Sequence, residues 1–193
     1  MNPSGKPAVF LDRDGTINEQ MGYINHISRF QLIPGVEEAI GRVNAAQIPV
    51  VVVTNQSGLA RGYFSAQLLD AVHQKMTDQL AEKNAHVDGI YICPHHPEAK
   101  EEQYRQTCTC RKPKTGLLEQ AAQDLGIDLN RSFVVGDRWS DIKCGAAAGA
   151  TSILVMTGYG RGDAEYIGPT QQVQPNYIAE DLSQAVEWIL DQI

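Results

Sequence analysis

The chain has 193 residues, of which 42% are hydrophobic, and its formal net charge is −7. This length suits one sizeable core and is short for two, so we expect a single domain over residues 1–193. The negative charge argues against nucleic-acid binding, and a protein of this charge that handles phosphates has to concentrate its positive groups in one cleft.

Five short apolar runs predict β-strands, and helical patterns lie between most of them. The expected strands cover residues 8–11, 48–53, 87–92, 132–135 and 151–155. The expected helices cover residues 35–46, 65–83, 116–125, 139–148 and 179–190. Because strands and helices alternate, the sequence predicts an α/β fold with a parallel sheet flanked by helices on both sides.

Two aspartates, Asp12 and Asp14, follow the first expected strand and precede Gly15 and Thr16. On an extended backbone, residues two apart point to the same side. Their carboxylates repel unless a cation lies between them or one of them holds a proton. Both arrangements suit phosphate chemistry, with one carboxylate as nucleophile and metal ligand and the other as proton carrier. The alternative is an ordinary turn at a strand end, where Asp, Gly and Thr are common.

Two further polar segments are candidates for phosphate binding. The strand 48–53 leads into a loop whose hydroxyl and N–H groups suit a phosphate cradle, formed by Thr54, Asn55, Gln56, Ser57 and Gly58. The alternative there is an ordinary turn. Arg111 and Lys112 stand just ahead of the helix 116–125 and are candidates to neutralise a transferring phosphoryl group. Solvated surface is the alternative for these two cations.

An Asp-x-x-x-Asp pattern, Asp137 and Asp141, follows the strand 132–135 and Gly136. A hard divalent cation requires oxygen ligands, so Asp137 is a candidate direct ligand and Asp141 a candidate supporting group. The alternative for Asp141 is a charge that the helix dipole favours at an N-terminus. Arg138 lies between them and is a candidate contact for the substrate.

Three cysteines and a histidine have the spacing of a metal site. Cys93 and His95 are two apart, twelve residues follow, and then come Cys108 and Cys110. Three thiolates and one imidazole make a closed tetrahedral site, which is typical of structural zinc. We therefore expect a zinc-binding loop over residues 93–110 that fixes the adjacent Arg111 and Lys112, with His96 pointing away from the metal. The alternative is four unrelated residues.

Together these motifs resemble those of the haloacid dehalogenase (HAD) superfamily of aspartate-nucleophile phosphatases, which has four motifs in the order seen here around Asp12, Thr54, Lys112 and Asp137. The resemblance implies a Rossmann-like HAD core in which Asp12 is the nucleophile and Asp14, protonated, is the proton donor. It also implies that Thr54 and Lys112 bind the phosphoryl group. Mg²⁺ would be held by Asp12, Asp137 and the backbone carbonyl of Asp14. The segments between the motifs are too short for a large cap domain, so we expect an open site.

Nearly the whole chain is similar to one branch of this superfamily, which holds D-glycero-D-manno-heptose-1,7-bisphosphate 7-phosphatases and histidinol-phosphatase domains. Residues 17–18, 22–23, 54–58, 93–97, 108, 110–113 and 136–137 carry this likeness. It implies that the substrate is contacted by Glu19, Gln20, Met21, Gly22, Thr54, Asn55, Gln56, Ser57, Arg111, Lys112 and Arg138. Members of the branch often carry Lys at the position of Arg138, so this chain keeps a positive charge there on a different side chain.

The activity that the resemblance implies is a Mg²⁺-dependent phosphatase that removes the C7 phosphate of heptose 1,7-bisphosphate through an aspartyl-phosphate, in the synthesis of nucleotide-activated heptose for lipopolysaccharide or another glycan. Histidinol phosphate and other small phosphorylated metabolites are alternative substrates. A different class is a zinc-containing interaction module without activity, which has no need for Asp12, Asp14, Lys112 and Asp137 together. We expect a phosphorylated sugar as partner, no nucleic acid, no membrane, and a monomer.

The expected location is the cytoplasm. Residues 1–7 lack the apolar core of a signal peptide, and no apolar run approaches the ~18 residues of a transmembrane helix. A chain without an export signal favours free thiols or metal ligands over disulfides for its four cysteines.

Overall fold

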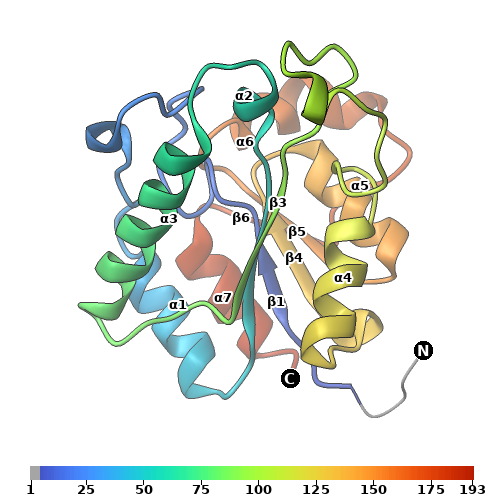
Figure 1. Cartoon of the computed structure of the whole chain (residues 1–193). Coiled ribbons are helices and arrows are strands. Elements are labelled where there is room, and N and C mark those ends of the chain that lie inside the picture. The colour runs from blue at the N-terminus through green and yellow to red at the C-terminus, as the bar shows by residue number, and fades with distance from the viewer. Residues whose placement is uncertain (1–4) are drawn as a thin grey trace.

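The computed structural model of the chain describes residues 5–193 and shows one sheet of six parallel strands (Figure 1). Across the sheet the strands are β3 (Gly89–Cys93), β2 (Val50–Asn55), β1 (Val9–Leu11), β4 (Phe133–Gly136), β5 (Thr151–Val155) and β6 (Tyr177–Ala179). The order of the strands reverses direction between β1 and β4. Open α/β sheets bind their ligands at such a switch point, beyond the carboxyl ends of the strands.

Helices cover both faces of the sheet. One face packs against α1 (Val36–Ala45), α3 (Ala66–Ala81) and α7 (Leu182–Leu190), and the other packs against α4 (Gly116–Leu125) and α5 (Trp139–Ala148) (Figure 1). Two short helices, α2 (Ser57–Ala60) and α6 (Gly160–Gly162), lie at the end of the sheet opposite the C-terminus of the chain (Figure 1). The layers are therefore helix, sheet and helix, as the alternating pattern predicted.

The central strand β1 is apolar at every position because both of its faces are buried. Val9 and Leu11 pack into the core beneath α1, α3 and α7, whereas Ala8 and Phe10 pack into the core beneath α4 and α5. All four residues are buried, because side chains alternate between the two faces of a strand and both faces are covered here.

The predicted fold class is confirmed, and the differences concern the ends of elements and short elements that the sequence did not indicate, among them one strand and two short α-helices. The strand β6 was not predicted because it has only three residues and Ile178 within it is exposed. The last helix was predicted to begin at 179 but begins at Leu182, since the side chain of Asp181 caps it by accepting the N–H of Gln184 at 2.9 Å. The two short α-helices are α2 and α6.

The segments outside the sheet and its covering helices are short and form no large cap over the core within residues 5–193. Between β1 and α1, residues 17–34 form a short loop with a single turn of 3₁₀ helix, and no large cap domain lies within residues 5–193. No helix in that range is both long and apolar enough to cross a membrane. The prediction that residues 1–7 lack a signal peptide falls in part on residues 1–4, outside the described residues.

Candidate active site

The predicted site residues meet at the carboxyl end of the sheet. Asp12 follows β1, Thr54 lies near the end of β2 and Asp137 follows β4, and β1 pairs with both of the other strands. A cavity of about 440 Å³ opens there. Its lining includes most of the residues that the sequence singled out, which are Asp12, Asp14, Gln20, Gly22, Thr54, Asn55, Gln56, Ser57, Arg111, Lys112, Asp137, Arg138 and Asp141.

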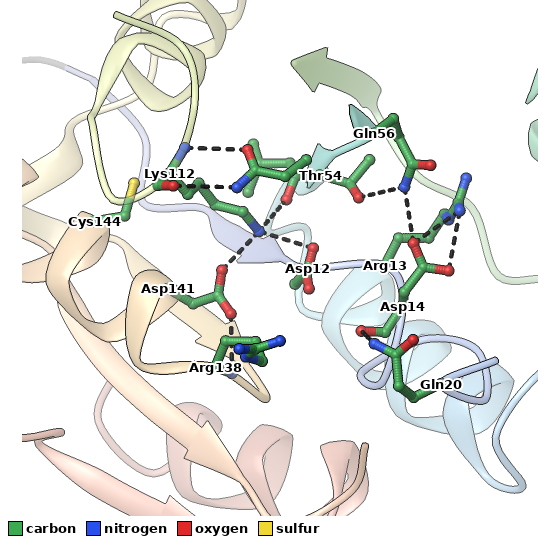
Figure 2. Close-up of polar contacts among 12 residues, drawn as sticks. Asp12, Arg13, Asp14, Gln20, Thr54, Gln56, Lys112, Arg138, Asp141 and Cys144 are labelled. Carbon is green, nitrogen blue, oxygen red and sulfur yellow. Dashed lines mark hydrogen bonds and ion pairs between the residues drawn. The ribbon is translucent and has the colours of Figure 1, made fainter. Parts of the chain in front are cut away.

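Lys112 is the buried cation of the site. Its ammonium lies 2.8 Å from Oδ1 of Asp12, 2.7 Å from Oδ1 of Asp141 and 2.7 Å from the carbonyl oxygen of Val53 (Figure 2). The side-chain amide of Asn55 holds the main chain of Lys112 by donating to its carbonyl and accepting its N–H, each at 3.1 Å. Asn55, predicted to bind substrate, thus uses its amide to position Lys112.

Three buried carboxylates surround this one ammonium. Oxygens of Asp12, Asp137 and Asp141 lie within 4.8 Å of one another. Burial and the neighbouring carboxylates raise the pKa of Asp137 to about 8, and burial raises the pKa of Asp12 to about 6 although Lys112 opposes this shift. Burial would lower the pKa of Lys112, but the two paired carboxylates raise it above its usual value, so the ammonium stays charged.

The donor set fits a divalent cation. Three carboxylates and one ammonium leave two negative charges in excess when all are ionised, and such an excess in a buried place requires a counter-charge. Asp137 is fully buried, and its Oδ1 has no hydrogen-bond partner among the described residues, while its Oδ2 accepts the N–H of Tyr159 at 2.8 Å. Oxygen donors of this kind are the ligands that Mg²⁺ prefers.

Asp141 contacts both the start of its own helix and the cation of the site. It lies in the first turn of α5, where its Oδ2 accepts the backbone N–H of Arg138 at 3.1 Å, and its Oδ1 pairs with Lys112. A residue at a helix N-terminus thereby also fixes the cation of the site.

Asp14 is held by several hydrogen bonds that favour its ionised form. Its carboxylate accepts hydrogen bonds from Arg13 at 2.8 and 3.0 Å and from Gln56 at 2.8 Å (Figure 2). It also accepts one from Asn18 at 3.1 Å. Burial would raise the pKa of Asp14, but the Arg13 guanidinium and these hydrogen bonds outweigh burial and hold the pKa below its usual value. These contacts favour the ionised carboxylate in the free protein, whereas the family resemblance implies a protonated Asp14 at the first step of the reaction.

Arg13 is a site residue that sequence reasoning missed. It is only 2% exposed, and its Nη1 lies 3.0 Å from Nε2 of His73 in α3, while its Nη2 binds Asp14. Burial and the nearby guanidinium lower the pKa of His73 to about 4, so this imidazole is neutral and accepts from Arg13. The position of Arg13 between two aspartates was the available signal.

A second missed element is the loop after β5, residues 156–160. The hydroxyl of Thr157 donates to the carbonyl of Gly15 at 2.6 Å, and the N–H of Tyr159 donates to Asp137. Gly15 and Gly158 both have positive φ, and a side chain at either would collide with the Asp137 carboxylate. The same rule that located the other motifs, polar residues at the carboxyl end of a parallel strand, indicates this loop as well.

Two predicted substrate contacts do not line the cavity, Glu19 and Met21. Glu19 is exposed, and its backbone N–H donates to Gln31 at 2.9 Å. Met21 packs against the core, and its carbonyl accepts from Arg29 at 2.9 Å. The neighbours Gln20 and Gly22 do line the cavity.

The predicted zinc ligands form a compact cluster beside the active site. Sγ of Cys93 lies 3.1 Å from Sγ of Cys110 and 3.6 Å from Sγ of Cys108, and Nδ1 of His95 lies 3.3 Å from Sγ of Cys110. All four cysteines of the chain are free thiols, and these four ligand atoms lie within 4.8 Å of one another, as a tetrahedral metal requires. His96 points elsewhere, with Nε2 2.9 Å from Arg61.

Comparison with known proteins identifies the family. The chain is 46% identical over 189 residues to D-glycero-D-manno-heptose-1,7-bisphosphate 7-phosphatase of Thermosynechococcus vestitus, and the match covers 95% of each chain. It is 47% identical over 155 residues to D-glycero-beta-D-manno-heptose-1,7-bisphosphate 7-phosphatase of Photorhabdus laumondii, covering 80% of this chain and 82% of that one. The chain belongs to the heptose-bisphosphate phosphatase family.

Structural similarity agrees with membership of the heptose-bisphosphate phosphatase family. The crystal structure of D,D-heptose 1,7-bisphosphate phosphatase from B. bronchiseptica, complexed with magnesium and phosphate, has a TM-score of 0.86 and 35% identity, and the match covers 97% of this chain and 99% of that one. Residues 109–185 also match the family described as HAD-hydrolase-like. The HAD-like fold predicted from the motifs is therefore confirmed.

Proposed function

We propose that the protein hydrolyses the C7 phosphate of D-glycero-D-manno-heptose 1,7-bisphosphate and leaves the C1 phosphate in place. The observation that carries this proposal is the convergence of Asp12, Asp137, Asp141 and Lys112 on one open cavity, in a chain whose relatives bear that activity in their names. The product, a sugar 1-phosphate, is suited to a reaction that attaches a nucleotide.

Asp12 is the proposed nucleophile. Its carboxylate attacks the phosphorus in line with the sugar oxygen, so a bond forms between the carboxylate and phosphorus while the bond from phosphorus to the sugar oxygen breaks. The ammonium of Lys112, 2.8 Å from Asp12, and the hydroxyl of Thr54 stabilise the charge on the phosphoryl oxygens. Water then attacks the aspartyl-phosphate and releases inorganic phosphate.

Asp14 is the proposed proton carrier. It gives a proton to the departing sugar oxygen and later takes one from the attacking water. Its carboxylate is ionised in the free protein, which is the form that the second step needs. Binding of a phosphate dianion nearby favours the protonated form, because like charges raise a carboxyl pKa, and this prepares Asp14 for the first step.

Two metal ions belong to the proposal. Asp12, Asp137 and the carbonyl of Asp14 would hold Mg²⁺, with Asp141 in support, and the cation when bound neutralises charge on the transferring phosphoryl group. Cys93, His95, Cys108 and Cys110 would hold a structural zinc that orders the loop ahead of Arg111 and Lys112. The crystallised relative with magnesium and phosphate supports the first assignment.

The test is phosphate release from heptose 1,7-bisphosphate with added Mg²⁺, with the product identified as the 1-phosphate. Histidinol phosphate is assayed beside it under the same conditions. We expect the bisphosphate to give the higher kcat/KM. Faster turnover of histidinol phosphate, or release of the C1 phosphate, would refute the proposed substrate.

A further inference from the structure

Arg138 lines the active-site cavity and is held by two neighbours. Its side chain is 48% exposed, and its Nε lies 3.6 Å from Oδ2 of Asp163. The centre of its guanidinium lies 4.4 Å from the ring centroid of Tyr159, within the range of a cation–π contact. Tyr159 also lines the cavity and is 45% exposed.

The loop that carries Tyr159 is hydrogen-bonded to residues of the active site. Its N–H donates to Oδ2 of Asp137 at 2.8 Å, and Thr157, two residues earlier, donates to the carbonyl of Gly15 at 2.6 Å. Arg138 comes from the start of α5 and Tyr159 from the loop after β5, so two separate elements bring the cation and the ring together.

We propose that Tyr159 is a positioning residue for substrate specificity, whose ring holds the Arg138 guanidinium toward the cavity to bind the second, non-reacting phosphate of a sugar bisphosphate. This inference rests on the proposed function. It assigns to Tyr159 a role that the motifs gave no reason to expect.

The physical basis is preorganisation. An arginine side chain loses rotamer freedom when it binds an anion, and a ring face that already restricts it reduces that loss. The long ion pair with Asp163 and the contact with the Tyr159 ring use few of the five N–H donors of the Arg138 guanidinium. Donors therefore remain for phosphate oxygens. Because the second phosphate does not react, the contact binds substrate and transition state equally and acts on KM.

The experiment compares two substrates, heptose 1,7-bisphosphate and the same sugar with only the 7-phosphate, in Tyr159→Leu and Tyr159→Phe. We expect Tyr159→Leu to raise KM for the bisphosphate roughly two- to fivefold, the scale of an exposed cation–π contact, with kcat unchanged. KM for the 7-phosphate stays as in the wild type. Tyr159→Phe keeps the ring and restores the wild-type KM.

The matched control is Tyr166→Leu, the same change at a tyrosine of the next segment that is 71% exposed and is not among the residues that line the cavity. It should leave both KM values unchanged. Melting temperatures of all variants check that the fold is intact.

A double-mutant cycle with Arg138→Leu shows whether Tyr159 acts through Arg138. If it does, Tyr159→Leu has no further effect on KM in the Arg138→Leu background. Additive effects would overturn the inference, as would equal loss in Tyr159→Phe and Tyr159→Leu, or an equal rise of KM for both substrates. A wild-type enzyme that turns over neither substrate refutes the proposed function, and the inference with it, whereas normal wild-type turnover with no effect of Tyr159→Leu refutes the inference alone.

Discussion

Two clusters of metal-ligand residues lie close together in this protein, and they are built in opposite ways. The carboxylate cluster, Asp12, Asp137 and Asp141, comes from the ends of β1 and β4 and the start of α5, and it faces a cavity. The thiol cluster, Cys93, His95, Cys108 and Cys110, comes from the end of β3 and the loop that follows it, and none of its members lines that cavity.

We propose that the carboxylate cluster is the site of the reaction and that the thiol cluster supports it. The carboxylate cluster has an excess of negative charge beside the Lys112 ammonium, and the adjoining cavity leaves space where a phosphate can enter. Four soft ligands in the thiol cluster would complete a tetrahedron and leave no open position. The two clusters are joined by chain, since Cys110 precedes Arg111 and Lys112 directly. Changes in the carboxylate cluster should therefore abolish turnover, and changes in the thiol cluster should reduce it.

The largest effect is expected for Asp12→Asn, which removes the nucleophile and keeps the shape of the side chain. Turnover should fall by at least about two orders of magnitude, the scale for loss of a nucleophile. Phosphate release from heptose 1,7-bisphosphate measures it. Asp70→Asn, the same change at an exposed position of α3, is the control and should retain full activity. Normal turnover by Asp12→Asn would show that the nucleophile is misassigned.

A smaller effect is expected for Cys110→Ser in the thiol cluster. Loss of one ligand should release zinc and leave the loop before Lys112 mobile, so turnover should drop on the order of tenfold, as for other misplaced catalytic groups, while the circular dichroism of the sheet persists. Zinc content per chain is measured in parallel. Cys144→Ser, outside the cluster, should retain zinc. Full activity of a chelated, zinc-free sample would contradict the supporting role.

The smallest effect is a pH dependence of the thermal stability, which we expect from the carboxylate cluster. The pKa of Asp137 is about 8 and that of Asp12 about 6 in the metal-free fold, both above the ordinary value of 3.8, because of burial and mutual repulsion. Between pH 4 and 8 these two carboxyl groups therefore bind more protons in the folded state than in the unfolded state, so their contribution to metal-free stability falls as pH rises through this window.

Added Mg²⁺ favours the ionised carboxylates and should reverse this trend. We expect it to raise the melting temperature by roughly a few degrees at pH 8 and by less at pH 5, as measured by thermal denaturation. Asp137→Asn should lose most of this response. An equal shift at both pH values, or an undiminished shift in Asp137→Asn, would contradict the assignment of the carboxylate cluster as the magnesium site.

The motifs that sequence reasoning found are those in which residue type and spacing carry the chemistry. Asp12 and Asp14 stand two apart after a buried strand, and the paired spacing of the cysteines and His95 predicted a cluster that the structure brings together. Short apolar runs predicted five of the strands, whereas the three-residue β6, with Ile178 exposed, gave no such signal.

What the amino-acid sequence determined by itself was local: which strands are buried, where polar residues interrupt them, and which ligand types are available. The tertiary structure alone decided the partners, because they come from distant segments. It placed His73 of α3 against Arg13, turned the amide of Asn55 toward Lys112, and set the ring of Tyr159 under Arg138. Spacing along a chain fixes which side a residue faces, but packing between elements fixes what that residue meets there.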